Sequence, residues 1–144
     1  MYSRILVPTD GSPGTASAIE HAVEHARTYD ATLHTLYVVD TTIAADAGVA
    51  GVYGALEDTG REAIDAVRTA AARAGVDAAE ASLARGAPYR VILDYVDEND
   101  IDLVVMGTHG RRGLERYLLG STTEKVVRLA DVPVLTVRMT DDSA

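Results

Sequence analysis

The feature that most constrains the fold of this chain is a regular alternation, from end to end, of short apolar runs with longer segments of helical periodicity. We expect the apolar runs, which are bounded by turn residues, to be strands. They cover residues 4–7, 33–39, 80–85, 102–106 and 133–138. Most of them are continuously apolar rather than alternating, which is typical of strands covered by helices on both sheet faces.

The segments between these runs are predicted to be helices. Ser12 suits the N-cap of the first helix and Pro13 its first position. The later helices are predicted at about residues 55–74, from Pro88 onward, and at residues 121–130. Gly75 is placed to end the second of the four, because glycine accepts the left-handed conformation that follows many helices. We expect residues 40–54 to form a loop of small residues and residues 139–144 to be a frayed tail.

This β-α-β-α-β-α-β-α-β pattern predicts an α/β fold. Right-handed crossovers between successive parallel strands build an open, doubly wound parallel sheet with helices on both faces. No linker, internal repeat or low-complexity tract interrupts the 144 residues, so we expect one domain over residues 1–144.

Composition narrows the functional classes. The chain has no cysteine, and its longest apolar runs are far below the roughly 18 residues that a membrane span needs. The N-terminal residues lead straight into a strand without signal-peptide architecture, so the expected compartment is the cytoplasm. The net charge of −9 disfavours binding to nucleic acid or an anionic membrane surface.

Aspartate is abundant, whereas Lys125 is the only lysine. This imbalance suggests a salt-adapted, halophilic protein, because high ionic strength screens the repulsion within an acidic surface. The alternative is an ordinary acidic cytosolic protein.

The pattern most indicative of function is a glycine-rich segment over residues 107–123. Gly107, Gly110, Gly120 and Ser121 have the spacing G-x-x-G-x9-G-S, between the end of the fourth strand and the start of the last helix. Open α/β sheets bind ligands at the carboxyl ends of their strands. Glycine lets the backbone approach a phosphate closely, because no Cβ intervenes. The spacing and its position therefore predict a phosphate site.

The start of the last helix adds donors to this site. The N–H groups of Ser121, Thr122 and Thr123 have no partner within the helix, and the helix dipole favours an anion there. Arg111 and Arg112 are available to neutralise phosphate charge. The alternative is structural: Ser121 and Glu124 match an S-x-x-E capping box, which would use these residues without a ligand.

A second candidate group follows the first strand, in the segment Pro8-Thr9-Asp10-Gly11-Ser12. The Asp10 carboxylate is suited to accept hydrogen bonds from a ribose or to help hold a phosphate-bound cation. It is equally suited to close a turn by accepting from nearby backbone N–H groups. The sequence leaves both roles open.

Taken together, these motifs resemble the universal stress protein family, in its ATP-binding branch. The resemblance runs from Ile5-Leu6-Val7-Pro8-Thr9-Asp10-Gly11-Ser12 through Val105-Met106-Gly107-Thr108-His109-Gly110-Arg111 to Leu118-Leu119-Gly120-Ser121-Thr122-Thr123 and the last strand. It implies a Rossmann-like five-stranded sheet in the order 3-2-1-4-5, with Asp10 and Gly107 on opposite sides of one crevice.

The resemblance also implies a ligand and a partner. ATP or another adenine nucleotide is expected, often with Mg²⁺ or Mn²⁺ held through the phosphates and with Asp10 as a further ligand. Adenine would lie near Pro8, Thr9 and Val38. Ribose and phosphates would lie against Asp10, Met106, Gly107, Gly110, Arg111, Gly120, Ser121, Thr122 and Thr123. A homodimer through the last strand, Val134–Val137, is expected as well, and it would cover an apolar sheet edge.

Enzymatic turnover is not indicated by any motif. His109 lies within the glycine-rich loop, where a phosphate contact is the alternative to a general base. His21 and His25 lie one helical turn apart but lack a third metal ligand in view. Three hypotheses remain at this stage: a nucleotide-dependent regulatory module, a slow ATPase or self-phosphorylating protein, and a homodimeric interaction module that does not use nucleotide.

Overall fold

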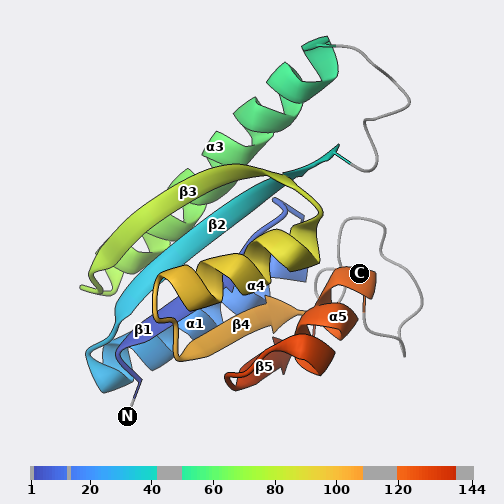
Figure 1. Ribbon diagram of the computed structural model, residues 1–144. Coiled ribbons are helices and arrows are strands. Elements are labelled where there is room, and N and C mark those ends of the chain that lie inside the picture. The colour runs from blue at the N-terminus through green and yellow to red at the C-terminus, as the bar shows by residue number, and fades with distance from the viewer. Residues whose placement is uncertain (1, 13, 42–49, 109–119, 139–144) are drawn as a thin grey trace.

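A computed structural model of the chain describes residues 2–12, 14–41, 50–108 and 120–138. Its centre is a five-stranded sheet in which every neighbouring pair is parallel and the strand order is β3-β2-β1-β4-β5 (Figure 1). The strands are β1 (Arg4–Pro8), β2 (Thr32–Asp40), β3 (Ala78–Gly86), β4 (Leu103–Gly107) and β5 (Val134–Val137). The predicted fold class and strand order are confirmed.

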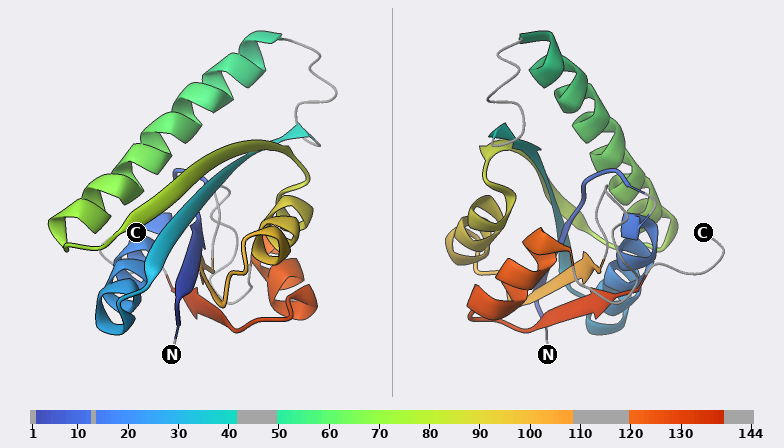
Figure 2. Two further views of the ribbon diagram at one scale, coloured as in Figure 1. Left: turned by 60° about the vertical axis from the view of Figure 1, so that its left-hand side comes forward. Right: turned by 90° about the vertical axis from the view of Figure 1, so that its right-hand side faces the viewer.

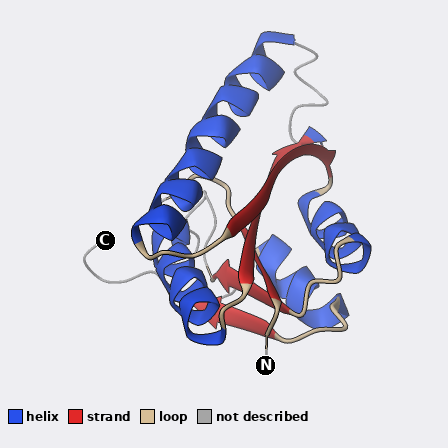
Figure 3. Ribbon diagram, turned by 90° about the vertical axis from the view of Figure 1, so that its left-hand side faces the viewer, coloured by secondary structure: helices blue, strands red, loops and turns tan. Residues whose placement is uncertain are grey.

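Helices cover both faces of the sheet. α1 (Gly14–Tyr29) and α3 (Ala50–Arg73) lie on one face, and α4 (Pro88–Glu98) and α5 (Ser121–Leu129) on the other (Figure 2). The same layering is visible when the molecule is coloured by secondary structure (Figure 3). Most predicted element ends differ from the observed ends by one or two residues, because frayed ends leave no sharp signal in a sequence.

One predicted boundary was wrong by more. Residues 50–54 were expected in a loop but belong to α3, which begins at Ala50. Gly51 and Gly54 suggested a loop, since glycine disfavours a helix by about 1 kcal/mol relative to alanine. Extending an existing helix gains a hydrogen bond for each added residue, and that gain outweighs the local preference.

The expected end of α3 is confirmed. Gly75 has φ of 70°, and its N–H donates to the Ala72 carbonyl while that of Val76 donates to the Ala71 carbonyl. These are the two bonds of a Schellman motif, which glycine allows without steric cost.

The core consists of two apolar layers, one on each face of the sheet. Ile5 and Val7 of β1 face α1 and α3, whereas Leu6 between them faces α4 and α5. All three are fully buried, because successive side chains of a strand point to opposite faces and both faces are covered. Among the described residues, no helix is both long enough and apolar enough to span a bilayer.

Candidate functional site

The sheet has its topological switch point between β1 and β4. From β1 the chain builds outward through β2 and β3 on one side, and through β4 and β5 on the other. β1 pairs with β4 through Ile5 with Leu103 and Leu6 with Val104, and both strands continue beyond those residues. The carboxyl ends of the two strands therefore lie at the switch point, where open α/β sheets form the crevice that binds ligands.

The β1 side of this crevice is a tightly bonded turn. The Thr9 N–H donates to the Leu36 carbonyl (2.9 Å), and the Thr9 hydroxyl oxygen accepts from the Gly11 N–H (3.2 Å). Asp10 Oδ1 accepts from the Ser12 N–H (2.8 Å) and from the Thr15 hydroxyl (2.9 Å). Asp10 thus fastens the turn to the start of α1, which is the structural role that the sequence left open. Its role toward a ligand stays a prediction.

The β4 side brings the predicted glycines and α5 together. The Thr123 hydroxyl donates to the Gly107 carbonyl (2.8 Å), so the first turn of α5 is fixed to the end of β4. The Gly120 N–H donates to the Thr108 carbonyl (2.6 Å), and the Thr108 N–H donates to the Val137 carbonyl (3.0 Å). Thr123 and Thr108 are both buried. Gly107, Gly120 and Thr123 therefore lie close together, and their contact with a phosphate stays a prediction.

The N-terminus of α5 is not capped by a side chain. Its N-cap residue is Gly120, with φ of −60° and ψ of 153°, so Ser121 is the first helical residue rather than the cap. Glu124 lies near Arg128 instead (3.4 Å). The capping-box alternative for Ser121 and Glu124 is therefore not realised. In the described part of the chain, no backbone partner or side chain accepts from the Ser121, Thr122 or Thr123 amides.

The remaining predicted residues divide into two groups. Pro8 is buried at the end of β1, Met106 is buried in β4, and Val38 is half-buried in β2. Pro8 pairs with Leu36, so Val38 lies two residues beyond the end of β1, at the carboxyl edge of the sheet. Gly110 and Arg111, like His109 and Arg112, lie outside the described residues.

A hollow of about 260 Å³ borders the Asp10 turn, between α1 and α3. It is lined by hydroxyls of Thr9, Ser12, Thr15 and Thr59, by Glu62, and by small apolar side chains. Sequence reasoning missed Thr15 and Thr59. The signal for Thr15 was its place five residues after Asp10, at the start of the predicted first helix, whereas Thr59 is 49 positions from Asp10 and is placed only by the packing of α3.

No site for a metal held by protein ligands alone is present in residues 2–12, 14–41, 50–108 and 120–138, because no three histidine, aspartate or glutamate side chains converge there. Of the His21–His25 pair on α1, His21 is exposed to solvent and His25 is half-buried. His25 Nδ1 lies 2.8 Å from the His21 carbonyl oxygen, so one ring nitrogen bonds the backbone of the same helix.

The arrangement defines a class of protein. It is a doubly wound α/β protein in which a helix begins at the switch point of the sheet, a position suited to an anion. A model of the universal stress protein family matches residues 1–138, and the chain belongs to that family. A universal stress protein of Methanocaldococcus jannaschii is 36% identical over 142 residues, covering 96% of this chain and 83% of the relative.

Solved structures agree with this assignment. A universal stress protein from Lactobacillus plantarum is 30% identical, with a TM-score of 0.79 over 95% of this chain and 98% of that one. Another universal stress protein, crystallised in complex with cAMP, is 29% identical, with a TM-score of 0.69 over 96% of this chain and 98% of that one.

Proposed function

We propose that this universal stress protein binds ATP in the crevice between β1 and β4 and acts as a nucleotide-dependent regulatory module. The observation that carries the proposal is the start of α5, where no described group accepts from the amides of Ser121, Thr122 and Thr123 and the Thr123 hydroxyl bonds the Gly107 carbonyl. A helix N-terminus with free amides attracts anions through both its donors and its dipole. The relative in complex with cAMP supports an adenine nucleotide as the source of that anion.

The proposed residue roles follow from this placement. Phosphates bind the amides of residues 121–123, and Gly107 and Gly120 leave room for them because neither has a side chain. Gly110 and Arg111 complete the phosphate contacts in the proposal. Adenine lies toward Pro8, Thr9 and Val38, at the carboxyl ends of β1 and β2.

A divalent cation fits this site only together with the nucleotide. Asp10 is the one carboxylate in the predicted set, and its Oδ1 already accepts two hydrogen bonds. Mg²⁺ commonly takes one or two carboxylates together with phosphate oxygens and water. Asp10 and the phosphates of ATP would therefore hold Mg²⁺ or Mn²⁺ and neutralise part of the phosphate charge.

The test adds a negative charge at the helix start without disturbing the helix. A Ser121→Asp variant places a carboxylate at the first position of α5, which the dipole favours, so the fold should persist. The same carboxylate repels phosphate. By isothermal titration with ATP and MgCl₂, we expect affinity to fall by at least about tenfold. Thr69→Asp, on an exposed position of α3, adds the same charge elsewhere and should bind ATP normally.

Two further measurements separate the alternatives. Mass spectrometry of small molecules released on denaturation should find an adenine nucleotide, and added ATP should raise the melting temperature by mass action. Equal ATP affinity in Ser121→Asp and Thr69→Asp would contradict the site. Metal-dependent phosphate release above that of a Gly110→Val control would favour a slow ATPase. No melting shift at millimolar ATP would favour a nucleotide-independent interaction module.

We further propose a homodimer formed by β5. Val134 and Leu135 are only half-buried and Thr136 is exposed on this edge strand, while Val127 and Leu129 of α5 are 43% and 51% exposed. An apolar edge strand is a template for pairing with another chain. Light scattering after gel filtration should give the mass of a dimer, and Thr136→Lys should shift it toward the monomer. Thr69→Lys, far from β5 in sequence and on α3, should leave the mass unchanged.

A further inference from the structure

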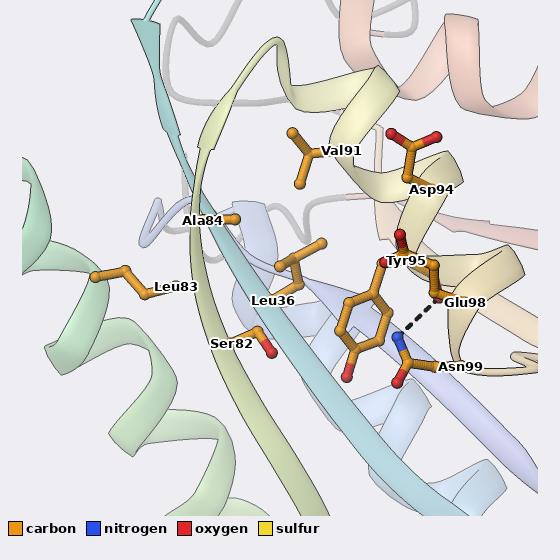
Figure 4. A pocket seen from close by; sticks show the side chains of 9 residues that line it. All are labelled: Leu36, Ser82, Leu83, Ala84, Val91, Asp94, Tyr95, Glu98 and Asn99. Carbon is orange, nitrogen blue, oxygen red and sulfur yellow. Dashed lines mark hydrogen bonds between the residues drawn. The ribbon is translucent and has the colours of Figure 1, made fainter.

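A cavity of about 470 Å³ lies between β3 and α4, away from the crevice described above. None of its lining residues belongs to the predicted nucleotide set. Figure 4 shows Ser82 and Ala84 of β3 on one side and the α4 side chains on the other, with Leu83 pointing away toward α3. The cavity exists because Ser82 and Ala84 are too small to fill the space that α4 leaves over β3.

The lining combines an apolar floor with acidic and polar groups. Half-buried Ala84 and Val91 supply the accessible apolar surface, above the fully buried Leu36. Asp94 and Glu98 lie one helical turn apart on α4, and both are exposed to solvent. No lysine, arginine or histidine lines the cavity. A volume of several hundred Å³ is typical of small-molecule pockets.

In the described part of the chain, neither carboxylate has a basic side chain within ion-pair distance. Among the described ion pairs and hydrogen bonds, none involves Asp94 or Glu98. The last turn of α4 contains no basic residue, so its carboxylates face the negative end of the helix dipole. Carboxylates at i and i+4 also repel each other. A bound cation would relieve both penalties.

A bare metal ion is a poor match for this lining. The described residues place only two carboxylates here, and no third histidine, aspartate or glutamate joins them. Ala84 and Val91 offer nothing to a metal, but they suit methylene groups, whose removal from water is favourable. Asn99 donates its Nδ2 to the Tyr95 carbonyl (3.1 Å), which leaves its side-chain oxygen as a further acceptor.

We propose that the cavity between β3 and α4 binds an aliphatic polyamine. Its ammonium groups pair with Asp94 and Glu98 and donate to Asn99, while its methylene chain lies on Ala84 and Val91. The occupant is a free small molecule rather than a basic side chain of a protein partner, because the volume matches a compact ligand and the apolar surface lies inside the cavity. The polyamine site shares no residue with the proposed nucleotide site, so polyamine binding does not require nucleotide.

The test is calorimetric titration of the full chain with spermidine at low ionic strength. The double variant Asp94→Asn/Glu98→Gln changes exposed groups and should fold normally. Its spermidine affinity should be at least about tenfold weaker, because each charge-assisted hydrogen bond is among the stronger kinds. The matched control is Glu20→Gln/Glu24→Gln, which neutralises two exposed carboxylates of the same spacing on α1. It should bind spermidine as the unmodified chain does.

A cavity-filling variant separates a shaped site from a merely negative surface. Ser82→Leu keeps both carboxylates but occupies the space, so it should also weaken spermidine binding by about tenfold or more; its melting curve verifies folding. Equal weakening by the α1 control, full binding by Ser82→Leu, or displacement of spermidine by equimolar Mg²⁺ would overturn the proposal. Binding of an oligolysine peptide but not of spermidine would overturn it too.

Discussion

At the scale of single residues, the site depends on hydroxyl groups that fasten loops to helices. The Thr15 hydroxyl holds Asp10 on the β1 side, and the Thr123 hydroxyl holds Gly107 on the β4 side. The sequence indicated Thr123 as a ligand contact and left Asp10 open between a ligand contact and a turn residue. In the structure, each side chain makes a hydrogen bond that fixes a loop or strand end to a helix. Whether such a hydrogen bond forms depends on which strand end lies next to the start of the helix.

Thr123→Val tests the fastening of α5. The substitution keeps the shape of the side chain but removes the bond to the Gly107 carbonyl at a position that is 6% exposed. We expect the free energy of unfolding in urea to fall by about 1–3 kcal/mol, because a partly buried carbonyl loses its partner. Thr122→Val, one residue earlier and half-buried, is the control, and we expect a smaller change there. Equal losses at both positions would argue against a specific role for the Thr123 bond.

At the scale of elements, α3 approaches the sheet unusually closely at one point. A Cβ atom on Gly60 would lie 2.6 Å from Leu83 Cδ1 and 2.6 Å from Tyr37 Cδ1. Tyr37 and Leu83 belong to the small apolar cluster that α3 forms with β2 and β3. The close packing of α3 on the sheet therefore favours glycine at position 60, although glycine has a poor helix propensity.

Gly60→Ala tests this contact. In an exposed helix the change would stabilise by about 1 kcal/mol. Here overpacking costs typically 1–3 kcal/mol, so we expect a net loss of roughly 1 kcal/mol in urea unfolding. Adding Leu83→Ala to the variant removes one of the two clashes. The double variant should therefore lose less than the sum of the two single losses. A stabilised Gly60→Ala protein would show that α3 is not held this close.

The N-terminal part of α3 is also linked to β3 by charge. Arg85 donates to Glu57 Oε2 from its Nε (3.1 Å) and from a terminal nitrogen. This hydrogen bond is the main cause that lowers the pKa of Glu57 below its ordinary value of 4.5, against a smaller opposing effect of desolvation. A carboxyl whose folded-state pKa is lowered stabilises the fold above its unfolded pKa, and that contribution disappears as pH falls through the folded-state pKa.

Glu57→Gln should therefore lower the melting temperature above about pH 4.5, and by progressively less as the pH falls below that value. Melting curves between about pH 3 and pH 7 check this. Asp65→Asn is the control, because Asp65 is exposed on the same helix and has no ion pair in the described residues. A melting difference for Glu57→Gln that is independent of pH would show that the ion pair is not its cause.

At the scale of the whole molecule, the dominant property is a net charge of −9. The ion pairs that the structure describes, such as Arg27 with Glu24 and Arg128 with Glu124, are exposed and screened by salt. Repulsion among the excess carboxylates is screened as well. Which effect is larger decides how stability responds to ionic strength.

We expect repulsion to be the larger effect, so KCl should raise the melting temperature. The Debye length falls from about 10 Å at roughly 0.1 M to about 3 Å at roughly 1 M salt, which removes most repulsion between exposed charges. Asp65→Asn/Asp97→Asn, at two exposed positions, should show a smaller rise because it starts with less repulsion. A melting temperature that falls with KCl would contradict the salt-adapted interpretation.

The sequence by itself determined the α/β class, the positions of the strands and most of the helices, and the end of α3 at Gly75. These follow from local patterns: apolar runs, helical spacing and the backbone freedom of one glycine. It also indicated the segments that meet at the switch point, because strand ends and helix starts are local features.

Only the tertiary structure determined which contacts those segments make with one another. The pairing of β1 with β4, the bond from Thr123 to Gly107, the close approach at Gly60 and the cavity between β3 and α4 all join residues distant along the chain. Each depends on the volume of side chains on two different elements. Ser82 and Ala84 carry no signal of a cavity until α4 is packed beside them, since space is a property of the assembled pair.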